Sequence, residues 1–309
     1  MYLSEVTTRR GAAAALALSL ATIGVTAQDN AQWERLTTDS YDLYAPTKAD
    51  IEQARPELEF AATQFRKYFG VTAPKIAVVL SNDQRGALPV VGDVAAKGLP
   101  VLNWLTDAAW ASQHGGVVTH SESHILPHEA CHLFLVTYVN EKITKERAGA
   151  KAPTHYGHPQ IPDWFDEGVA SLCERPEMQA RRRAKLKESL ANKMPLDELF
   201  TMAHPLAGGI PVRSMPGSMP STMKPGTRVG AVTFSGSQLP QEMVAKAVTF
   251  YAQVFSVIEY LSTTAAPESM RVLADRMAAG ATTRKALADV KGLPSADALE
   301  GAWLATIEK

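Results

Sequence analysis

Two histidines and a glutamate near the middle of the chain have the types and spacing of a metal site. The sequence HEACH at residues 128–132 places His128 and His132 four positions apart. On an α-helix this spacing is a rotation of about 40° and a rise of roughly 6 Å, so both imidazoles project from one face. Glu129 lies about 60° around the helix from His132, where a carboxylate can reach an attacking water without being a ligand. The motif therefore predicts metal-assisted hydrolysis.

The residues around this motif predict a largely buried helix. Pro127 suits a first helical turn, and the apolar run 133–136 continues the helix. Buried imidazoles and a buried carboxylate are costly unless something compensates them, and a metal ion would do so. The alternative is a chance match on a structural helix.

A second helix is predicted to begin at Asp163. An aspartate is a good N-cap, and Asp166 at the third helical position favours the same start. Glu167 then lies in the first turn, and Gly168 removes a side chain where this helix must approach another closely. A catalytic zinc usually has three protein ligands, so the two histidines need a third ligand from a nearby helix.

Residues 162–170, with the sequence PDWFDEGVA, resemble the second motif of the gluzincin metallopeptidases. That motif is an aromatic or aliphatic pair, one variable residue and then Glu-Gly-x-Ala. The resemblance implies that Glu167 is the third ligand of a Zn²⁺ ion held by His128 and His132. It also implies that Glu129 is the general base.

The resemblance is closest to exported bacterial peptidase-MA-like proteins. It extends to the triplets Tyr-Ala-Gln at 251–253 and Ala-Trp-Leu at 302–304. It implies an α+β, zincin-like fold, with an active-site cleft between a small α/β half at 28–126 and a mainly helical half at 127–309. A flexible loop rich in Pro, Gly and Met is predicted at 202–241.

The chain departs from the gluzincin pattern in two places. The interval between His132 and Glu167 is longer than in the best-known gluzincins, and it contains His155 and His158. These two histidines are either competing metal ligands or part of a solvated or substrate-facing loop. At the position where some relatives place an acid that orients a ligand histidine, this chain has Ser171, whose hydroxyl can accept an imidazole N–H.

A protease also needs a donor that stabilises the oxyanion. Because related enzymes use a downstream tyrosine or histidine, Tyr251 is the candidate and Tyr156 the reserve. The alternative for Tyr251 is a core aromatic on an amphipathic helix. The basic run Arg181–Arg183 predicts the solvated face of a helix.

The two cysteines lie on the two helices that must share the metal. Cys131 is inside the first motif and Cys173 follows the second. An oxidising compartment permits them to pair. The alternative is two reduced, buried thiols that act as small hydrophobic groups.

The first 27 residues are typical of a cleavable export signal. Arg9 and Arg10 precede an apolar run at 11–25, and small residues end at Ala27. The apolar run is shorter than a bilayer span, which favours a cleaved signal, and an uncleaved membrane anchor is the alternative. The paired arginines leave open export by the twin-arginine route. The sequence predicts a periplasmic or secreted protein with one domain at 28–309 and no membrane span after cleavage.

Composition favours a globular protein. The chain has 309 residues, of which 46% are hydrophobic and 20% charged, and a net charge of −1, which argues against nucleic-acid binding. Hydrophobic patterns predict strands at 41–44 and 75–80, one or two strands near Val90 and Val101, an edge strand at 116–119, and helices at 49–69, 242–262, 268–278 and 296–307.

Together these features predict an exported zinc metallopeptidase that acts on peptide or protein substrates. Two alternatives from other classes remain open. One is a catalytically silent metal-binding module for peptide or cell-wall material on the same fold. The other is a structural protein with a chance motif.

Overall fold

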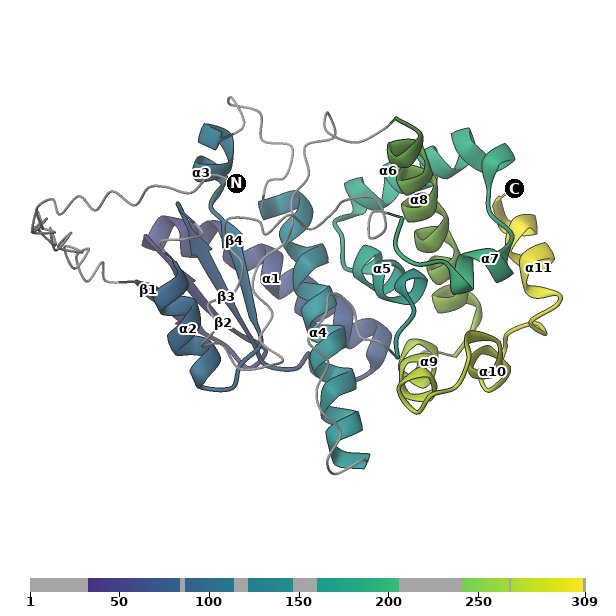
Figure 1. Cartoon of the computed structure of the whole chain (residues 1–309), viewed down its shortest axis with the longest axis horizontal. Helices are drawn as coiled ribbons and strands as arrows, with labels where there is room; N and C mark the ends of the chain where they lie inside the picture. The colour runs from purple at the N-terminus through teal and green to yellow at the C-terminus, as the bar shows by residue number, and fades with distance from the viewer. Residues whose placement is uncertain are drawn as a thin grey trace, which may run out of the picture. The chain divides into compact units, whose positions relative to one another are not determined.

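The computed structural model describes residues 33–83, 87–113, 122–146, 160–205, 241–266 and 268–307. Within these residues the protein is α+β: a small mixed sheet comes first, and helices dominate the rest (Figure 1). Several predictions lie outside the described residues, namely the export signal at 1–27, the edge strand at 116–119, His155, Tyr156, His158 and residues 206–240 of the loop predicted at 202–241.

The sheet has the strand order β1-β2-β3-β4. Its strands are β1 (Glu34–Thr37), β2 (Tyr41–Ala45), β3 (Ile76–Ser81) and β4 (Val101–Leu105). β1 pairs antiparallel with β2, and the other pairs are parallel. Every residue of β3 is buried, because α2 (Leu88–Ala96) covers one face of the sheet and α1 (Lys48–Phe69) packs on the other (Figure 1). The strands predicted at 41–44, at 75–80 and near Val101 are confirmed, and β1 was not predicted.

The strand predicted near Val90 is wrong, because this residue lies in helix α2. The neighbouring residues Val91 and Val94 are three positions apart, which places them on one helical face. That face packs in a cluster with Ala77 and Val79 of β3. Burial against the sheet therefore outweighs the β propensity of the valines.

Helix α1 joins the sheet to the helix that carries the histidine pair. Thr47 and Asp50 form a capping box at its start. On its buried face, Phe69 contacts Tyr138 of α4 (Glu122–Glu146) edge to face, with ring centroids 5.6 Å apart. The histidine helix is thereby fixed against the layer that covers the sheet.

The start predicted for the histidine helix is wrong. Helix α4 begins at Glu122, so Pro127 lies inside the helix and not in its first turn. A proline inside a helix gives up one backbone hydrogen bond, and the apolar packing of the following turns keeps the helix in place here. Proline alone therefore did not mark the helix boundary.

Helix α5 (Asp163–Leu172) begins where the sequence predicted, but its cap differs. Pro162 is the N-cap residue, and Asp163 is the first helical residue. The Asp163 carboxylate instead accepts the backbone N–H of His204 at 2.6 Å. The Asp163 side chain therefore binds a residue distant in sequence and does not cap its own helix.

The other helices follow in chain order. They are α3 (Asp107–Gln113), α6 (Pro176–Ser189), α7 (Leu196–Thr201), α8 (Gln241–Thr264), α9 (Ser269–Ala278), α10 (Thr283–Ala288) and α11 (Leu299–Ile307), with a short 3₁₀ helix, η1 (Leu190–Asn192), after α6. The helices predicted at 49–69, 242–262, 268–278 and 296–307 are confirmed to within a few residues as α1, α8, α9 and α11.

Two residues from the C-terminal triplets hold helical segments together. Gln253 is fully buried in α8, and its amide exchanges hydrogen bonds with the backbone N–H and C=O of Met194, at 2.9 and 2.6 Å. Trp303 of α11 donates its indole N–H to Ser256 Oγ at 3.0 Å. Both contacts anchor neighbouring segments to α8.

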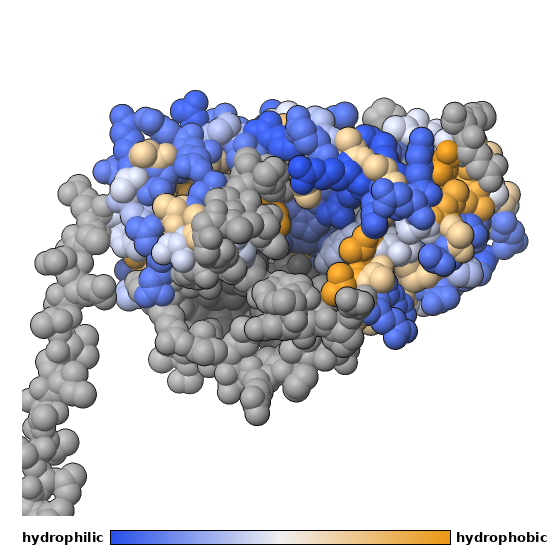
Figure 2. All heavy atoms as spheres, turned by 90° about the horizontal axis from the view of Figure 1, so that it is seen from above, coloured by the Kyte–Doolittle hydropathy of each residue, from blue (hydrophilic) through white to orange (hydrophobic). Residues whose placement is uncertain are grey.

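No described helix is long and apolar enough to cross a membrane. On the face seen in Figure 2, the described surface is mostly hydrophilic, and its apolar residues gather in separate small groups.

Gly168 allows α5 to lie close to α8. A Cβ atom at this position would meet Ile258 Cβ at 3.1 Å and the backbone oxygen of Val254 at 3.3 Å. The close approach predicted from this glycine is confirmed. Because Glu167 is the preceding residue, the same contact determines how far the candidate ligand stands from α8.

Substitution of Gly168 by alanine tests this packing. Crowding in a packed core costs about 1–3 kcal/mol, and alanine gains about 1 kcal/mol of helix propensity, so Gly168→Ala is expected to destabilise the protein. A Cβ atom at Gly92, in the middle of α2, would meet no atom of the described residues within 4 Å, so Gly92→Ala is expected to be neutral or stabilising. Chemical denaturation of the metal-free proteins measures both, and equal shifts would contradict the packing argument.

Candidate metal centre

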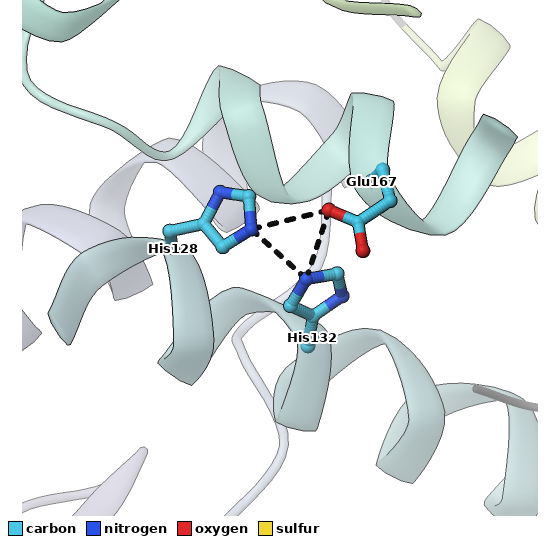
Figure 3. A group of neighbouring side chains, drawn as sticks. All are labelled: His128, His132 and Glu167. Carbon is cyan, nitrogen blue, oxygen red and sulfur yellow. Dashed lines mark hydrogen bonds and ion pairs between the residues drawn. The ribbon is translucent and has the colours of Figure 1, made fainter. Parts of the chain in front are cut away.

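Three donor atoms from two helices meet in the interior (Figure 3). His128 Nε2 and His132 Nε2 of α4 lie 3.0 Å apart. Glu167 Oε2 of α5 lies 3.3 Å from the first nitrogen and 3.5 Å from the second. All three residues are buried, and within the described ranges this is the group that could hold a metal ion. The structure thus brings together the three residues that the sequence predicted as ligands.

The donor set fits a divalent metal ion. Glu167 Oε2 is buried and makes no well-formed hydrogen bond within the described part of the chain. An ion that also faces the two ring nitrogens would satisfy this oxygen. Two imidazole nitrogens and one carboxylate oxygen form the ligand set of many catalytic zinc sites, which keep a fourth position for water or substrate.

The charges around these ligands are strongly coupled. Burial would lower the pKa of His132, but the carboxylates of Asp166 and Glu167 raise it well above its usual value. Burial would likewise raise the pKa of Glu167, but His132 and His128 hold it well below its usual range. A ligating imidazole must be neutral, so a metal ion would bind here in exchange for protons.

Each candidate histidine ligand faces a carboxylate with its other ring nitrogen. His132 Nδ1 lies 2.7 Å from Asp166 Oδ1, and His128 Nδ1 lies 2.8 Å from Glu174 Oε1. A carboxylate that accepts the Nδ1 proton leaves Nε2 with its lone pair toward the ion. The hydrogen bond with Asp166 therefore fixes the tautomer and direction of the His132 ring, and the Glu174 carboxylate lies at ion-pair distance from His128 Nδ1.

The orienting role predicted for Ser171 is wrong. Its hydroxyl donates to the backbone oxygen of Glu167, one turn earlier in α5, at 2.8 Å. A short side chain on this helix is closer to its own backbone than to the facing imidazole. Sequence reasoning missed Glu174, which lies beyond the end of α5 and is therefore not related to Glu167 by helical spacing.

Arg182 forms an ion pair with Glu174 and balances its negative charge. Its Nε donates to Glu174 Oε2 at 2.6 Å, and its second nitrogen contacts Oε1. Burial would raise the pKa of Glu174, but Arg182 and His128 lower it to about 2. The solvated face predicted for Arg181–Arg183 is therefore wrong for Arg182, because a buried carboxylate draws its guanidinium inward.

Tyr251 lies beside the centre, linked to it by a histidine that the sequence did not reveal. His204 Nε2 is 2.8 Å from the Tyr251 hydroxyl and 3.3 Å from Glu167 Oε1. Burial, with the charges of Glu167 and Glu129, raises the pKa of Tyr251 well above its usual value, so the hydroxyl stays protonated at neutral pH. His204 falls in the stretch predicted as a loop, where no spacing tied it to either motif.

Glu129 stands between the two candidate ligands on α4. It is half-buried, whereas its neighbours in the motif are buried. Its charge contributes to the raised pKa of Tyr251. The helix thus leaves this carboxylate partly exposed beside two buried candidate ligands.

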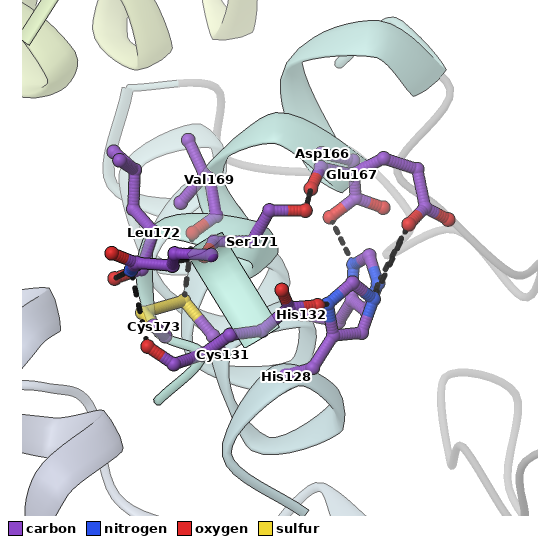
Figure 4. Close-up of a disulfide and its surroundings, with 11 residues drawn as sticks. His128, Cys131, His132, Asp166, Glu167, Val169, Ser171, Leu172 and Cys173 are labelled. Atoms are coloured by element: carbon purple, nitrogen blue, oxygen red, sulfur yellow. Dashed lines mark hydrogen bonds and ion pairs between the residues drawn. A yellow bond between two sulfur atoms is a disulfide. The ribbon is translucent and has the colours of Figure 1, made fainter. Parts of the chain in front are cut away.

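A disulfide joins Cys131 of α4 to Cys173 at the end of α5 (Figure 4). Both residues are buried, and their Cα atoms are 6.3 Å apart. Of the two alternatives for these cysteines, the structure has the pair. The bridge directly precedes His132 in one helix and Glu174 in the other segment, so it holds the two ligand-bearing segments together.

Comparisons with family models, with curated proteins and with solved structures gave no significant match to this chain.

Removal of the Glu167 carboxylate tests the ligand set. Glu167→Ala is expected to weaken metal binding by more than the roughly 10–100-fold that is typical of residues outside the ligand shell. The melting temperature of the metal-loaded protein should fall too, because metal binding stabilises the folded state. Mass spectrometry of bound metal after dialysis measures the loss. Glu198→Ala, at an exposed glutamate of α7, is the control, and normal metal content in Glu167→Ala would move the third ligand elsewhere.

The disulfide has a direct chemical test. Protein prepared in an oxidising compartment should take up no alkylating reagent when it is unfolded without reductant, because both sulfurs are paired. After reduction, the intact mass should rise by two alkyl groups. Two modified thiols in the unreduced sample would show that Cys131 and Cys173 are not joined.

Proposed function

We propose that this protein is an exported zinc metallopeptidase of the gluzincin type. The observation that carries the proposal is the buried meeting of His128 Nε2, His132 Nε2 and Glu167 Oε2, with the other ring nitrogen of each imidazole close to a carboxylate. Zinc bound to these three residues would polarise the scissile carbonyl and lower the pKa of the attacking water. The ligand types favour zinc over copper or iron.

Glu129 is the general base in this proposal. It follows His128 directly, so its carboxylate reaches the side of the centre without competing for the ion. It takes a proton from the attacking water and later gives it to the leaving amine. The half-buried position of Glu129 suits a group that must meet the substrate.

Tyr251 stabilises the oxyanion in this proposal. The Glu167 carboxylate only accepts hydrogen bonds, so His204 Nε2, at 3.3 Å from it, carries a proton. The same N–H can be shared with the Tyr251 oxygen at 2.8 Å. The tyrosine oxygen then accepts from His204, and its own hydrogen is free to donate to the substrate.

We further propose a zincin-like arrangement, with the cleft between the sheet half and the helical half. The support is that α4 packs against α1 and the sheet on one side and against α5 on the other, and that α5 packs against α8. Export is supported by the pattern of residues 1–27 and by the disulfide, since disulfides persist in oxidising compartments. Peptides or proteins outside the cytosol are the proposed substrates.

The substitution Glu129→Gln tests the mechanism. It keeps the size of the side chain and all three ligands, so zinc content and melting temperature should stay near those of the wild type. Hydrolysis of a peptide library should fall by about 10²–10⁴-fold, the usual contribution of a general base. Glu141→Gln, the same change at an exposed position of α4, is the control and should keep full activity.

Other outcomes would contradict the proposal in distinct ways. Near-normal hydrolysis by Glu129→Gln would remove Glu129 as the base. A wild-type protein that binds one zinc ion but cleaves no peptide would favour the silent binding module. Absence of stoichiometric zinc in the wild type would favour a structural protein with a chance motif.

A further inference from the structure

Two neighbouring arginines of α6 make contacts of the same kind, because each pairs with a carboxylate and lies over an aromatic ring of α8. Arg183 pairs with Glu259 of α8, with its Nε 3.1 Å from Oε2, and its guanidinium lies 5.3 Å from the ring centre of Phe255. Arg182 also lies 5.3 Å from the centre of an aromatic ring of α8, that of Tyr251. Both arginines thus combine an ion pair with a cation–π contact.

The two arginines differ in what their carboxylate partners touch. Glu259 is a partly exposed residue of α8. Glu174 is buried and holds the Nδ1 side of His128 at 2.8 Å. A chain of contacts therefore runs from Arg182 through Glu174 to the imidazole whose Nε2 faces the other ligands.

The contacts from Arg182 through Glu174 to His128 depend on the charge of the arginine. A buried carboxylate is unfavourable without a counter-charge, and the His128 ring is neutral when it binds a metal ion. Arg182 is then the fixed cation next to Glu174, and its planar fork holds both carboxylate oxygens. Ser171 is not a substitute, because its hydroxyl is engaged with the backbone of α5.

We propose that Arg182 is a positioning residue of the metal centre, which acts on His128 through Glu174 and on Tyr251 through the contact with its ring. The action on His128 concerns metal binding alone, and the action on Tyr251 rests on the proposed peptidase function. One guanidinium thus sets the relative positions of a metal ligand and of the oxyanion donor.

The first test measures the dissociation constant for Zn²⁺ by competition with a chelator, well below the melting temperature. Arg182→Gln should weaken binding by about 10–100-fold, as is typical when an outer-shell partner is lost. Arg183→Gln removes the ion pair and the cation–π contact of the neighbouring, more exposed arginine, so it should lower stability less and leave Zn²⁺ affinity unchanged. Unchanged affinity in Arg182→Gln, or equal losses in the two variants, would overturn the proposal.

A double-mutant cycle tests the route through Glu174. If Arg182 acts on His128 by holding this carboxylate, adding Arg182→Gln to Glu174→Gln should cause little further loss of Zn²⁺ affinity. Fully additive losses would overturn the route. If Arg182→Gln does not fold, Arg182→Lys against Arg183→Lys makes the same comparison, since lysine keeps the charge but loses the fork.

Peptide turnover at saturating Zn²⁺ tests the action on Tyr251. There the kcat of Arg182→Gln should still fall below that of Arg183→Gln, because the ring contact is lost even when the ion is bound. Equal kcat values would overturn this part of the proposal. A wild type that cleaves no peptide would overturn the peptidase function, while the Zn²⁺ affinities would still decide whether Arg182 positions His128.

Discussion

The burial of two imidazoles and a carboxylate against one another is the interaction on which the rest of this structure depends. Charged groups are expensive to remove from water unless each finds a partner of opposite charge. His128, His132 and Glu167 are accordingly enclosed by further charged groups, and the pKa of each is shifted by its neighbours. A divalent cation among the three donor atoms would complete this balance. The candidate metal centre thus bears on the charge balance of the core as well as on the proposed chemistry.

The geometry of the centre depends on how closely three helices can approach. Gly168 lets α5 lie against α8, and the bridge from Cys131 to Cys173 ties α4 to the end of α5. On its other side α4 packs on α1, which packs on the sheet. A ligand site with tolerances of a few tenths of an ångström therefore rests on packed helices, which are stiffer than loops.

The supports of the two histidines are of different kinds. Asp166 is the neighbour of Glu167 on α5, so His132 receives its orienting carboxylate and its fellow ligand from one helix. Glu174 lies beyond the end of α5 and is held by Arg182 of α6. The orientation of His128 therefore depends on a further helix, and through the Tyr251 ring on α8.

The sequence by itself determined the features that local backbone geometry controls. Helical spacing put His128 and His132 on one face, the Glu-Gly motif placed Glu167 one residue before a close approach, and continuous apolar runs marked the buried strands. Only the tertiary structure decided that Glu174, Arg182 and His204 join the centre, that Ser171 does not, and that Val90 is helical. Each of these depends on segments far apart in the chain, whose approach is determined by core packing and by charge neutralisation, and neither leaves a periodic signal in the sequence.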